Sequence, residues 1–419
     1  MLHHILFATG IAGYVAFVAP GADLRVPSDY ATIEAAIEAA APNDRILIAD
    51  GVYSGPGFVN LDTAGKSITI RGEHGPDNCI LDGAATPGAN AFTISSGEHI
   101  GTRIEDLTFR NFVTAAGDAG AIRIIGSAPA IEGCIFAQCS TAASPNPTTP
   151  GSAITLINSS PTITACTFTH NEGSAVHTDA DSVVYLINCL FEDNVTRPDD
   201  GRGGGAVLNE GRTLTFNSIY RRNRVEAIAG PARGGAFAHF GAALDLTNTT
   251  LVDNGVTGPA ETGGSAVYAA AGLIVNDNIV RDHAGDHQAG AFLIDGAASP
   301  DGFTAFITGA FTGNRIGAIR IEDPEQRLEV RIGTSDFCEN LHFDIHGPYV
   351  DWGTNTLCCP ADLDDTDRVD IADLLAVLAD WGACPGCPAD VTGDDVVNIL
   401  DLLLVLGAWG DCPDLPPGL

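Results

Sequence analysis

The sequence predicts an all-β parallel β-helix, a solenoid of stacked coils, with a small α-helical module after it. Three observations lead to this fold class. A motif of the form Thr164-Ala-Cys-Thr-Phe-Thr-His-Asn171 recurs along most of the chain. Copies at intervals of roughly 20 to 50 residues are typical of solenoids and repeat arrays. A short helical pattern precedes the repeats, and two acidic segments of a different kind follow them.

The composition favours a soluble extracellular protein. The chain has 419 residues, is 45% hydrophobic and contains 49 glycines, so it can bury a large core between many turns. Its 53 acidic residues outnumber the 20 basic ones and give a net charge of −33. Nucleic acids and anionic membrane surfaces attract basic patches, so neither is an expected partner. The excess of carboxylates suits cation binding.

Residues 1–22 resemble a signal peptide in pattern. An apolar run from Ile5 to Ala19 ends in Ala19-Pro-Gly-Ala22, which predicts a secretory signal peptide cleaved near Gly21 or Ala22. A buried N-terminal helix is the alternative. We therefore expect a secreted protein, with no membrane span because no later apolar run is long enough to cross a bilayer.

A helix and three strands are expected before the repeats. Residues Tyr30 to Ala41 carry apolar residues at helical spacing, with Ser28 or Asp29 as the cap. Strand patterns follow in Asp44–Tyr53, Lys66–Arg71 and Asn78–Gly83.

Two marks define each repeat. The first is an apolar anchor, at Phe109, Phe136, Phe168, Phe191, Ile219, Leu251, Ile279, Phe311 and Phe337. The second is a small residue followed by alanine and a short apolar run, as in Gly120-Ala-Ile-Arg123. Equivalent residues of a parallel β-helix stack about 4.8 Å apart, so we expect an apolar ladder inside and asparagine ladders at the turns. Cys134, Cys166 and Cys189 are expected to stack as buried thiols.

The stretch Ile33–Ala40 followed by Asn43–Tyr53 resembles the N-terminal cap and first coil of right-handed β-helix proteins of the pectin-lyase-like superfamily. The resemblance implies that residues 23–357 form a right-handed parallel β-helix whose exposed end is covered by the helix. Many such proteins are polysaccharide lyases or hydrolases, which implies a polysaccharide or cell-surface glycan as the ligand.

No catalytic residue can be assigned from the coils. A hydrolase needs paired carboxylates, and a lyase needs a base beside an acidic sugar. The stripe two positions after each marked alanine is a mixed face, made of Arg123, Thr155, His177, Leu208, Ala238, Tyr268, Leu293 and Arg320. Candidates considered elsewhere are His177 with Asp179 and Asp181, Glu210 with Arg212, Tyr220 with Arg221 and Arg222, and His239. A core or turn role is favoured for each. The alternative is a site in a cleft formed by loops 142–150, 196–204 and 257–263.

The C-terminal segment contains two units that repeat 28 residues apart, 359–382 and 387–410. Each has an acidic loop, an amphipathic helix and a final Trp-Gly. Calcium prefers six or more oxygen ligands from a flexible loop. The expected Ca²⁺ ligands are Asp362, Asp364, the carbonyl of Arg368, Asp370 and Asp373 in loop one, and Asp390, Asp394, the carbonyl of Val396, Asn398 and Asp401 in loop two.

This pair of units resembles the type I dockerin module. The resemblance implies that residues 358–414 bind calcium and dock onto a cohesin-like protein partner, with a strip of apolar helix residues for contact: Leu374, Leu375, Leu378, Leu402, Leu403 and Leu406. The sequence departs from the pattern at Asp367 and Asp395, where glycine is usual, and at Thr366 and Thr392, where a stronger ligand is usual. Two solvated acidic turns beside a helix pair are the alternative.

The cysteines of the C-terminal segment are expected to form disulfides, with zinc binding as the competing interpretation. One pairing joins Cys359 to Cys384 and Cys387 to Cys412, and another joins Cys359 to Cys412 and Cys384 to Cys387. Cys338 could pair with Cys358.

Three hypotheses follow from the sequence. The first is a secreted modular protein whose β-helix binds a glycan or surface and whose tail docks through calcium. The second is a polysaccharide lyase or glycoside hydrolase carrying the same tail. The third is a structural surface protein with a calcium-stabilised end.

Overall fold

The computed structural model describes residues 21–84, 88–114, 120–141, 151–198, 202–259, 262–283, 290–299, 301–315, 317–338, 340, 345–353, 355–357, 361–364, 366, 368–384, 387–392 and 396–411. The expected signal peptide therefore lies almost entirely outside the described residues.

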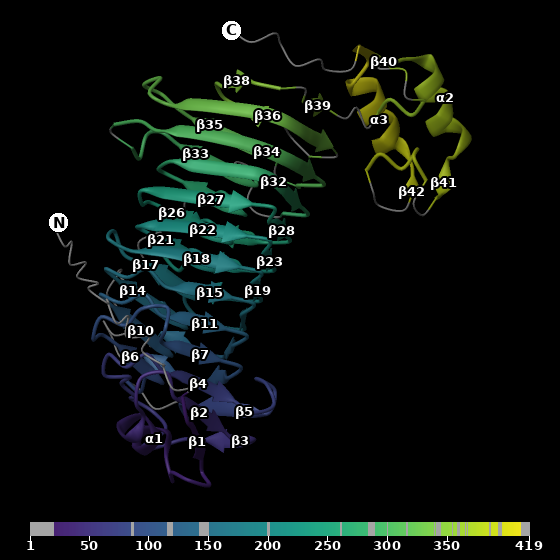
Figure 1. Cartoon of the computed structure of the whole chain (residues 1–419). Helices are drawn as coiled ribbons and strands as arrows, with labels where there is room; N and C mark the ends of the chain where they lie inside the picture. The colour runs from purple at the N-terminus through teal and green to yellow at the C-terminus, as the bar shows by residue number, and fades with distance from the viewer. Residues whose placement is uncertain are drawn as a thin grey trace, which may run out of the picture.

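The chain winds into a parallel β-solenoid with three faces (Figure 1). Face one holds β1 (Asp23–Val26), β2 (Arg45–Ile48), β4 (Thr69–Gly72), β7 (Arg103–Glu105), β11 (Ala130–Glu132), β15 (Thr162–Thr164), β18 (Val183–Ile187), β22 (Arg212–Phe216) and β27 (Ala243–Thr247). Face two holds β3 (Gly51–Tyr53), β5 (Cys79–Asp82), β8 (Thr108–Arg110), β12 (Ile135–Ala137), β16 (Thr167–Thr169), β19 (Leu190–Glu192), β23 (Ile219–Arg221) and β28 (Thr250–Val252).

Three longer strands run across both of these faces in the last coils. They are β32 (Leu273–Arg281), β34 (Thr304–Thr312) and β36 (Glu329–Cys338), and β36 also pairs with β38 (Val350–Asp351) and β39 (Thr356–Leu357). Face three is a separate sheet of β6 (Phe92–Ile94), β10 (Ile122–Ile125), β14 (Ile154–Ile157), β17 (Val176–Thr178), β21 (Val207–Asn209), β26 (Phe237–His239), β31 (Val267–Ala269), β33 (Phe292–Asp295), β35 (Ile319–Glu322) and β37 (Ile345–His346).

Stacked aromatic rings form the core beneath face two. Phe136, Phe168 and Phe191 follow one another in register, with ring centroids 4.8 Å and 4.4 Å apart. Tyr220 continues the stack, 4.7 Å from Phe191. Close contact between rings at these separations adds to the free energy gained by burying them.

Two of the predicted anchors were wrong by one residue. Ile219 and Ile279 point outward and are 42% and 47% exposed, whereas their neighbours Tyr220 and Val280 occupy the ladder. Adjacent strand residues face opposite sides of a sheet, so a slip of one position moves a side chain from core to solvent.

Single residues in the left-handed region turn the chain between faces one and two. They follow the face-one strands at Asp106, Gly133, Ala165, Asn188, Asn217, Asn248 and Asp277, with φ between 48° and 62°. Asparagine and aspartate tolerate this conformation better than most residues, which explains why they recur there.

A buried asparagine ladder closes the next turn, as predicted. Its described members are Asn171, Asn194, Asn223, Asn254, Asn314 and Asn340. Asn194, for example, donates from Nδ2 to the Phe168 carbonyl (3.0 Å) and to Asn223 Oδ1 (2.8 Å). Each rung therefore satisfies backbone groups that would otherwise be buried without a partner. His283 replaces asparagine in one coil, with Nε2 3.1 Å from the Leu251 carbonyl.

The cysteines of the repeat are buried free thiols, which confirms that prediction. Cys134 N donates to Cys166 Sγ at 3.4 Å, and Cys189 lies in the following coil. Burial raises the pKa of Cys189 to about 11. The Cys189 thiol therefore stays protonated and unreactive at neutral pH.

The N-terminal end is covered by α1 (Ile33–Ala39), which buries Ile33, Ala36 and Ile37. Its cap is Thr32, whose hydroxyl accepts from Ala35 N at 3.2 Å. The expected cap Asp29 instead accepts from the Arg25 amide at 3.0 Å, four residues back, and holds the turn before the helix.

Short strands lie in the segments that connect face two to face three. They are β9 (Val113–Thr114) with β13 (Ser140–Thr141), β20 (Val195–Thr196) with β24 (Arg224–Glu226) and β29 (Gly255–Thr257), and β25 (Ala232–Arg233) with β30 (Thr262–Gly263). Val225, Ala232 and Val256 form a small apolar cluster among them. These segments add a partial outer layer to the solenoid.

The tail is a pair of helices, α2 (Ile371–Ala379) and α3 (Ile399–Gly407), drawn in yellow in Figure 1. Two short antiparallel strand pairs connect the two units. β40 (Arg368–Val369) pairs with β43 (Gly410–Asp411), and β41 (Gly382–Ala383) pairs with β42 (Val396–Val397). Their shared core consists of equivalent residues from both units: Ala361, Val369, Val377, Ala389, Val397 and Val405. Within the described residues, no helix is long and apolar enough to cross a membrane.

A disulfide joins Cys384 to Cys387, with an S–S distance of 2.06 Å. This bond belongs to the second of the two pairings left open by the sequence. It excludes a bond between Cys384 and Cys359 and leaves neither sulfur as a thiolate for zinc. Cys359 and Cys412 lie outside the described residues.

Candidate functional sites

Loop one of the tail brings three carboxylates together. One oxygen from each of Asp362, Asp364 and Asp373 lies within 4.8 Å of the others. Asp373 is fully buried, and its oxygens accept from Leu363 N (2.6 Å) and Asp370 N (2.8 Å). The loop is thereby folded around the carboxylate at its end. A set made only of oxygen atoms matches what calcium prefers.

Loop two repeats this arrangement with a threonine in place of one carboxylate. Asp401 is fully buried and accepts from the Thr392 amide (2.9 Å), the Thr392 hydroxyl (2.8 Å) and Asn398 N (2.7 Å). Burial favours the protonated form, but these hydrogen bonds outweigh it and hold the pKa of Asp401 below its ordinary value. Asp390 accepts from the Thr392 hydroxyl at 3.2 Å, and Asp394 lies outside the described residues.

Two further expected ligands serve as helix caps. Asp370 and Asn398 each accept from the backbone amide two residues later, at 2.8 Å, and form capping boxes with Asp373 and Asp401. The expected carbonyl ligands also make local contacts: that of Arg368 accepts from the Thr366 hydroxyl (3.3 Å), and that of Val396 accepts from Asn398 Nδ2 (2.9 Å). Calcium ligation by these residues stays a prediction.

The tail exposes an unusual number of large apolar side chains. In the first unit, Ile371, Leu375, Leu378 and Trp381 are 49–56% exposed. Their equivalents in the second unit, Ile399, Leu403, Leu406 and Trp409, are 45–55% exposed. Of the six predicted leucines, only Leu374 and Leu402 pack against the core of the tail. We call the eight exposed residues the tail surface.

Face three carries a charged cluster whose pairing the sequence did not predict. His177 Nε2 lies 3.0 Å from Glu210 Oε2, and Arg202 Nη2 lies 3.4 Å from Glu210 Oε1. The hydrogen bond with His177 lowers the pKa of Glu210. Asp179 instead accepts from Ser182, and Arg212 lies on face one. The candidate groupings of His177 with Asp179 and of Glu210 with Arg212 were not the ones favoured by the sequence analysis, which preferred structural roles.

Two arginines from the connecting segments stack on aromatic rings of face three. The guanidinium of Arg202 lies 5.1 Å from the centre of the Phe240 ring, and that of Arg233 lies 4.7 Å from the centre of the Tyr268 ring. The two rings lie 5.3 Å apart. The predicted stripe is in register, but its members Leu208, Ala238, Tyr268 and Leu293 are buried rather than presented to solvent.

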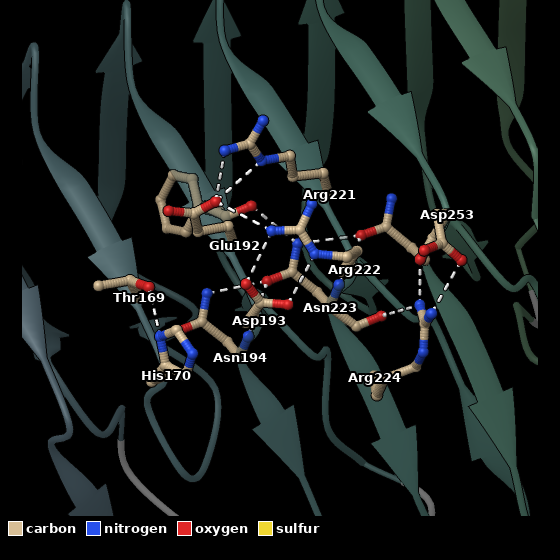
Figure 2. A network of polar contacts seen from close by, with 12 residues as sticks. Thr169, His170, Glu192, Asp193, Asn194, Arg221, Arg222, Asn223, Arg224 and Asp253 are labelled. Atoms are coloured by element: carbon tan, nitrogen blue, oxygen red, sulfur yellow. Dashed lines mark hydrogen bonds and ion pairs between the residues drawn. The ribbon is translucent and has the colours of Figure 1, made fainter.

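The remaining candidates have structural roles, as the sequence favoured. His239 is buried, with Nε2 3.0 Å from the Gly272 carbonyl. Tyr220 belongs to the core ladder. Figure 2 shows how Arg221 and Arg222 contact carboxylates of the preceding coil: Arg221 meets Glu192 at 2.6 Å and Arg222 meets Asp193 at 2.8 Å. Such exposed pairs brace neighbouring coils and contribute little stability individually.

The outer surface of face one carries both a cleft and a line of exposed apolar residues. The cleft has a volume of about 430 Å³ and is lined by Arg45, Leu47, Thr69, Arg71, Glu73, His74 and Glu105. In the later coils, Tyr185, Leu214, Ile274 and Phe306 occupy the same register position, with Asp245 between Leu214 and Ile274. Trp352 lies 5.9 Å from Phe306 between ring centres. We call these five residues the face-one strip. Tyr185, Ile274 and Trp352 are 38%, 42% and 64% exposed.

A family model described as "Right handed beta helix region" matches residues 77–304, more than half of the chain. The chain belongs to this right-handed β-helix family. A sequence search of curated proteins finds no match.

Solved structures with a similar fold include carbohydrate-active enzymes. The catalytic domain of a GH87 α-1,3-glucanase in complex with nigerose has 11% identity and a TM-score of 0.41, covering 81% of this chain and 69% of that one. The catalytic unit of the GH87 α-1,3-glucanase from Streptomyces thermodiastaticus has 12% identity and a TM-score of 0.39, covering 81% and 70%. A mannuronic acid specific family 6 lyase from human gut microbiota has 13% identity and a TM-score of 0.35, covering 76% and 78%. At these identities the likeness concerns the fold and not the chemistry.

In this right-handed β-helix, the side chains missed by sequence reasoning are Arg202 and Arg233. Both lie in segments of varying length outside the repeated strands, so no repeat position marked them. The only available signal was that an arginine recurs in the connecting segments of two successive coils.

Proposed function

We propose that this chain is a secreted modular binding protein. Its tail docks onto a protein partner once calcium has ordered the acidic loops, and its β-helix offers a glycan-binding face. The dockerin-like pattern of the tail, with a cohesin-like partner, is part of the proposal.

The observation that carries it is the twofold repetition of the tail surface. Each unit exposes an isoleucine, two leucines and a tryptophan at equivalent positions, and all eight are 45–56% exposed. Soluble proteins rarely leave so many large apolar side chains in water unless a partner covers them. Tryptophan is also among the residues enriched at the energetic centres of protein interfaces.

Calcium has a definite role in this proposal. Asp362, Asp364 and Asp373 would hold one ion, and Asp390 with Asp401 would contribute to a second. Asp373 and Asp401 also complete the capping boxes of α2 and α3, so the same carboxylates connect each loop to the helix that presents the tail surface. Neutralising the clustered charge by the ion stabilises the arrangement in which the helices are correctly placed.

The face-one strip supports the second part of the proposal. Trp352, Phe306 and Tyr185 present rings that can stack on the apolar face of a sugar, while Arg331 lies 5.5 Å from the centre of the Phe306 ring and can donate to hydroxyls. Aromatic surfaces with a few placed polar groups are typical of ligand sites. A polysaccharide or cell-surface glycan lying along the strip is the ligand we propose.

An enzymatic function as a polysaccharide lyase or glycoside hydrolase has less support from the geometry. The histidine of the charged cluster on face three, His177, is not an open base, because its Nε2 contacts Glu210 and its Nδ1 is buried. Neither ring nitrogen is open to a substrate, although a general base must reach the proton that it removes.

The test uses the full-length chain and Asp364→Ala. Among the described residues, the Asp364 carboxylate accepts a hydrogen bond only from the Thr366 hydroxyl, so its loss should leave the helices intact. We expect calorimetry to show calcium binding that is weakened in Asp364→Ala and unchanged in Asp380→Ala, an exposed aspartate at the end of α2. Equal titrations for all three proteins would contradict calcium binding at loop one.

Docking is tested with an immobilised cohesin domain. The proposal predicts that the chain is retained on this domain in calcium and released in chelator. It also predicts that the double variant Leu375→Glu with Leu403→Glu is not retained in calcium. Both leucines are about 55% exposed, so the substitutions should not disturb folding. No retention in calcium would contradict a cohesin-type partner, and light scattering in the same buffer shows whether a second copy of the chain covers the tail surface instead.

A further inference from the structure

We propose that Arg233, supported by Arg202 and the two rings beneath them, forms a recognition site for the carboxylate or sulfate of an acidic sugar on face three. This site lies on a different face from the strip proposed above, and neither calcium nor the tail takes part in it.

The first step is the continuity of the stack. Arg202 lies over Phe240, Phe240 packs against Tyr268, and Arg233 lies over Tyr268, with separations of 5.1, 5.3 and 4.7 Å. Tyr268 is fully buried, and its hydroxyl donates to Asp295 at 2.7 Å, so the ring under Arg233 is fixed. A guanidinium placed over a ring can still use its N–H groups for hydrogen bonds to another partner.

The second step concerns the surroundings of Arg233. Among the described residues, no carboxylate forms an ion pair with it, although most arginines of this acidic chain have such a partner. Its cross-strand neighbour is Gly263, which contributes no side chain beside the guanidinium. A β-carbon at Gly263 would lie 2.2 Å from Leu293 Cδ2, so a larger residue there would require the Leu293 side chain to move.

The third step is the chemistry of the ligand. The planar N–H fork of arginine matches the paired oxygens of a carboxylate or sulfate. The half-buried ring of Phe240 lies beside it and offers an apolar surface, as does the aliphatic part of Arg202. An acidic sugar combines an anionic group with an apolar ring face, and it therefore matches both features.

The long-range field of the protein works against such a ligand, because the net charge is −33. Binding must therefore come from the local contacts. Added salt screens the distant repulsion more than the contacts within the site. Affinity for the acidic sugar should consequently stay constant or rise with ionic strength, whereas adventitious attraction to an exposed arginine would weaken.

The experiment compares full-length wild type, Arg233→Met and Arg212→Met by calorimetry. Arg212 is an exposed arginine on face one without a described ion pair, so it is the matched control. Methionine keeps most of the packing on Tyr268 and removes the N–H groups. The probes are oligogalacturonate for carboxylate, a chondroitin sulfate oligosaccharide for sulfate, and a neutral cello-oligosaccharide.

We expect at least one acidic probe to bind, with an affinity that falls roughly tenfold or more in Arg233→Met and is unchanged in Arg212→Met. The acidic probe that binds identifies the anionic group. Equal affinities in wild type and Arg233→Met, equal losses in both variants, or binding of the neutral probe alone would overturn the proposal. An unfolding temperature within a few degrees of wild type shows that Arg233→Met is folded. If Arg233→Met does not fold, Arg233→Lys gives an independent measure, because lysine keeps the charge but lacks the planar N–H groups of arginine.

Discussion

His283 occupies a position that the neighbouring coils give to asparagine. Its ring lies between Asn254 and Asn314 in the buried ladder, with Nδ1 3.1 Å from Asn254 N and Nε2 3.1 Å from the Leu251 carbonyl. Burial lowers its pKa to about 4, and burial lowers the pKa of His239 to about 4 as well. Both side chains are therefore neutral in the native protein at pH 5 to 7.

These depressed pKa values predict a loss of stability in mild acid. Between the unfolded value of about 6.5 and the folded value of about 4, the unfolded chain binds more protons than the native one. The free energy of unfolding is therefore unaffected above pH 6.5 and falls as the pH drops through this window, by up to about 3 kcal/mol per histidine. Urea unfolding from pH 7 to pH 4 measures it.

His283→Asn serves as the matched variant, because asparagine is the residue of the neighbouring rungs. We expect it to equal wild type at pH 7 and to be more stable by about 2 kcal/mol at pH 5. Identical pH profiles for the two proteins would show that His283 is not held neutral in the ladder.

The roles of single residues could be predicted from the sequence wherever the same residue type recurs at equivalent positions of the coils. The asparagine positions, the buried thiols and the structural role of His239 could all be predicted, because stacking places equivalent side chains together. The partners of His177 and Glu210 could not, since they come from neighbouring coils whose alignment depends on the lengths of the segments between them.

Among the elements, the register of β23 separates what the repeat predicts from what it does not. The motif Asn217-Ser-Ile-Tyr220 aligns with Asn188-Cys-Leu-Phe191, which places Tyr220 and not Ile219 inside. The apolar anchor was predicted at Ile219 from the sequence. The structure instead keeps the aromatic stack and satisfies the Tyr220 hydroxyl, which lies 3.0 Å from Thr215 Oγ1.

Truncating the two residues tests this register. Tyr220→Ala removes a fully buried ring between stacked neighbours and should lower the free energy of unfolding by about 3–5 kcal/mol, as for other large aromatic truncations. Ile219→Ala should cost less than about 1 kcal/mol, because that side chain is already 42% exposed. Urea unfolding at pH 7 distinguishes them, and a larger cost for Ile219→Ala would mean that β23 lies in the opposite register.

Across the whole molecule, the repetitive and non-repetitive parts have separate roles. The stacked ladders explain the phenylalanines, asparagines and cysteines that recur at equivalent positions of the coils. The candidate sites lie on exposed residues of face one, on the segments that connect face two to face three, and on the tail. The two helices of the tail could be predicted because its two units repeat. The exposure of Leu375, Leu378, Leu403 and Leu406 needed the structure, since a helical pattern alone does not show which apolar residues find a partner.

The central claim is that calcium organises the tail and thereby presents the tail surface. Hydrogen exchange of the full-length chain, measured with calcium and with chelator, tests it most directly. We predict that calcium slows amide exchange in peptides covering 361–411, that exchange in the β-helix is unchanged, and that the effect is reduced in Asp364→Ala. Identical exchange of the tail with and without calcium in the wild-type protein would contradict the claim.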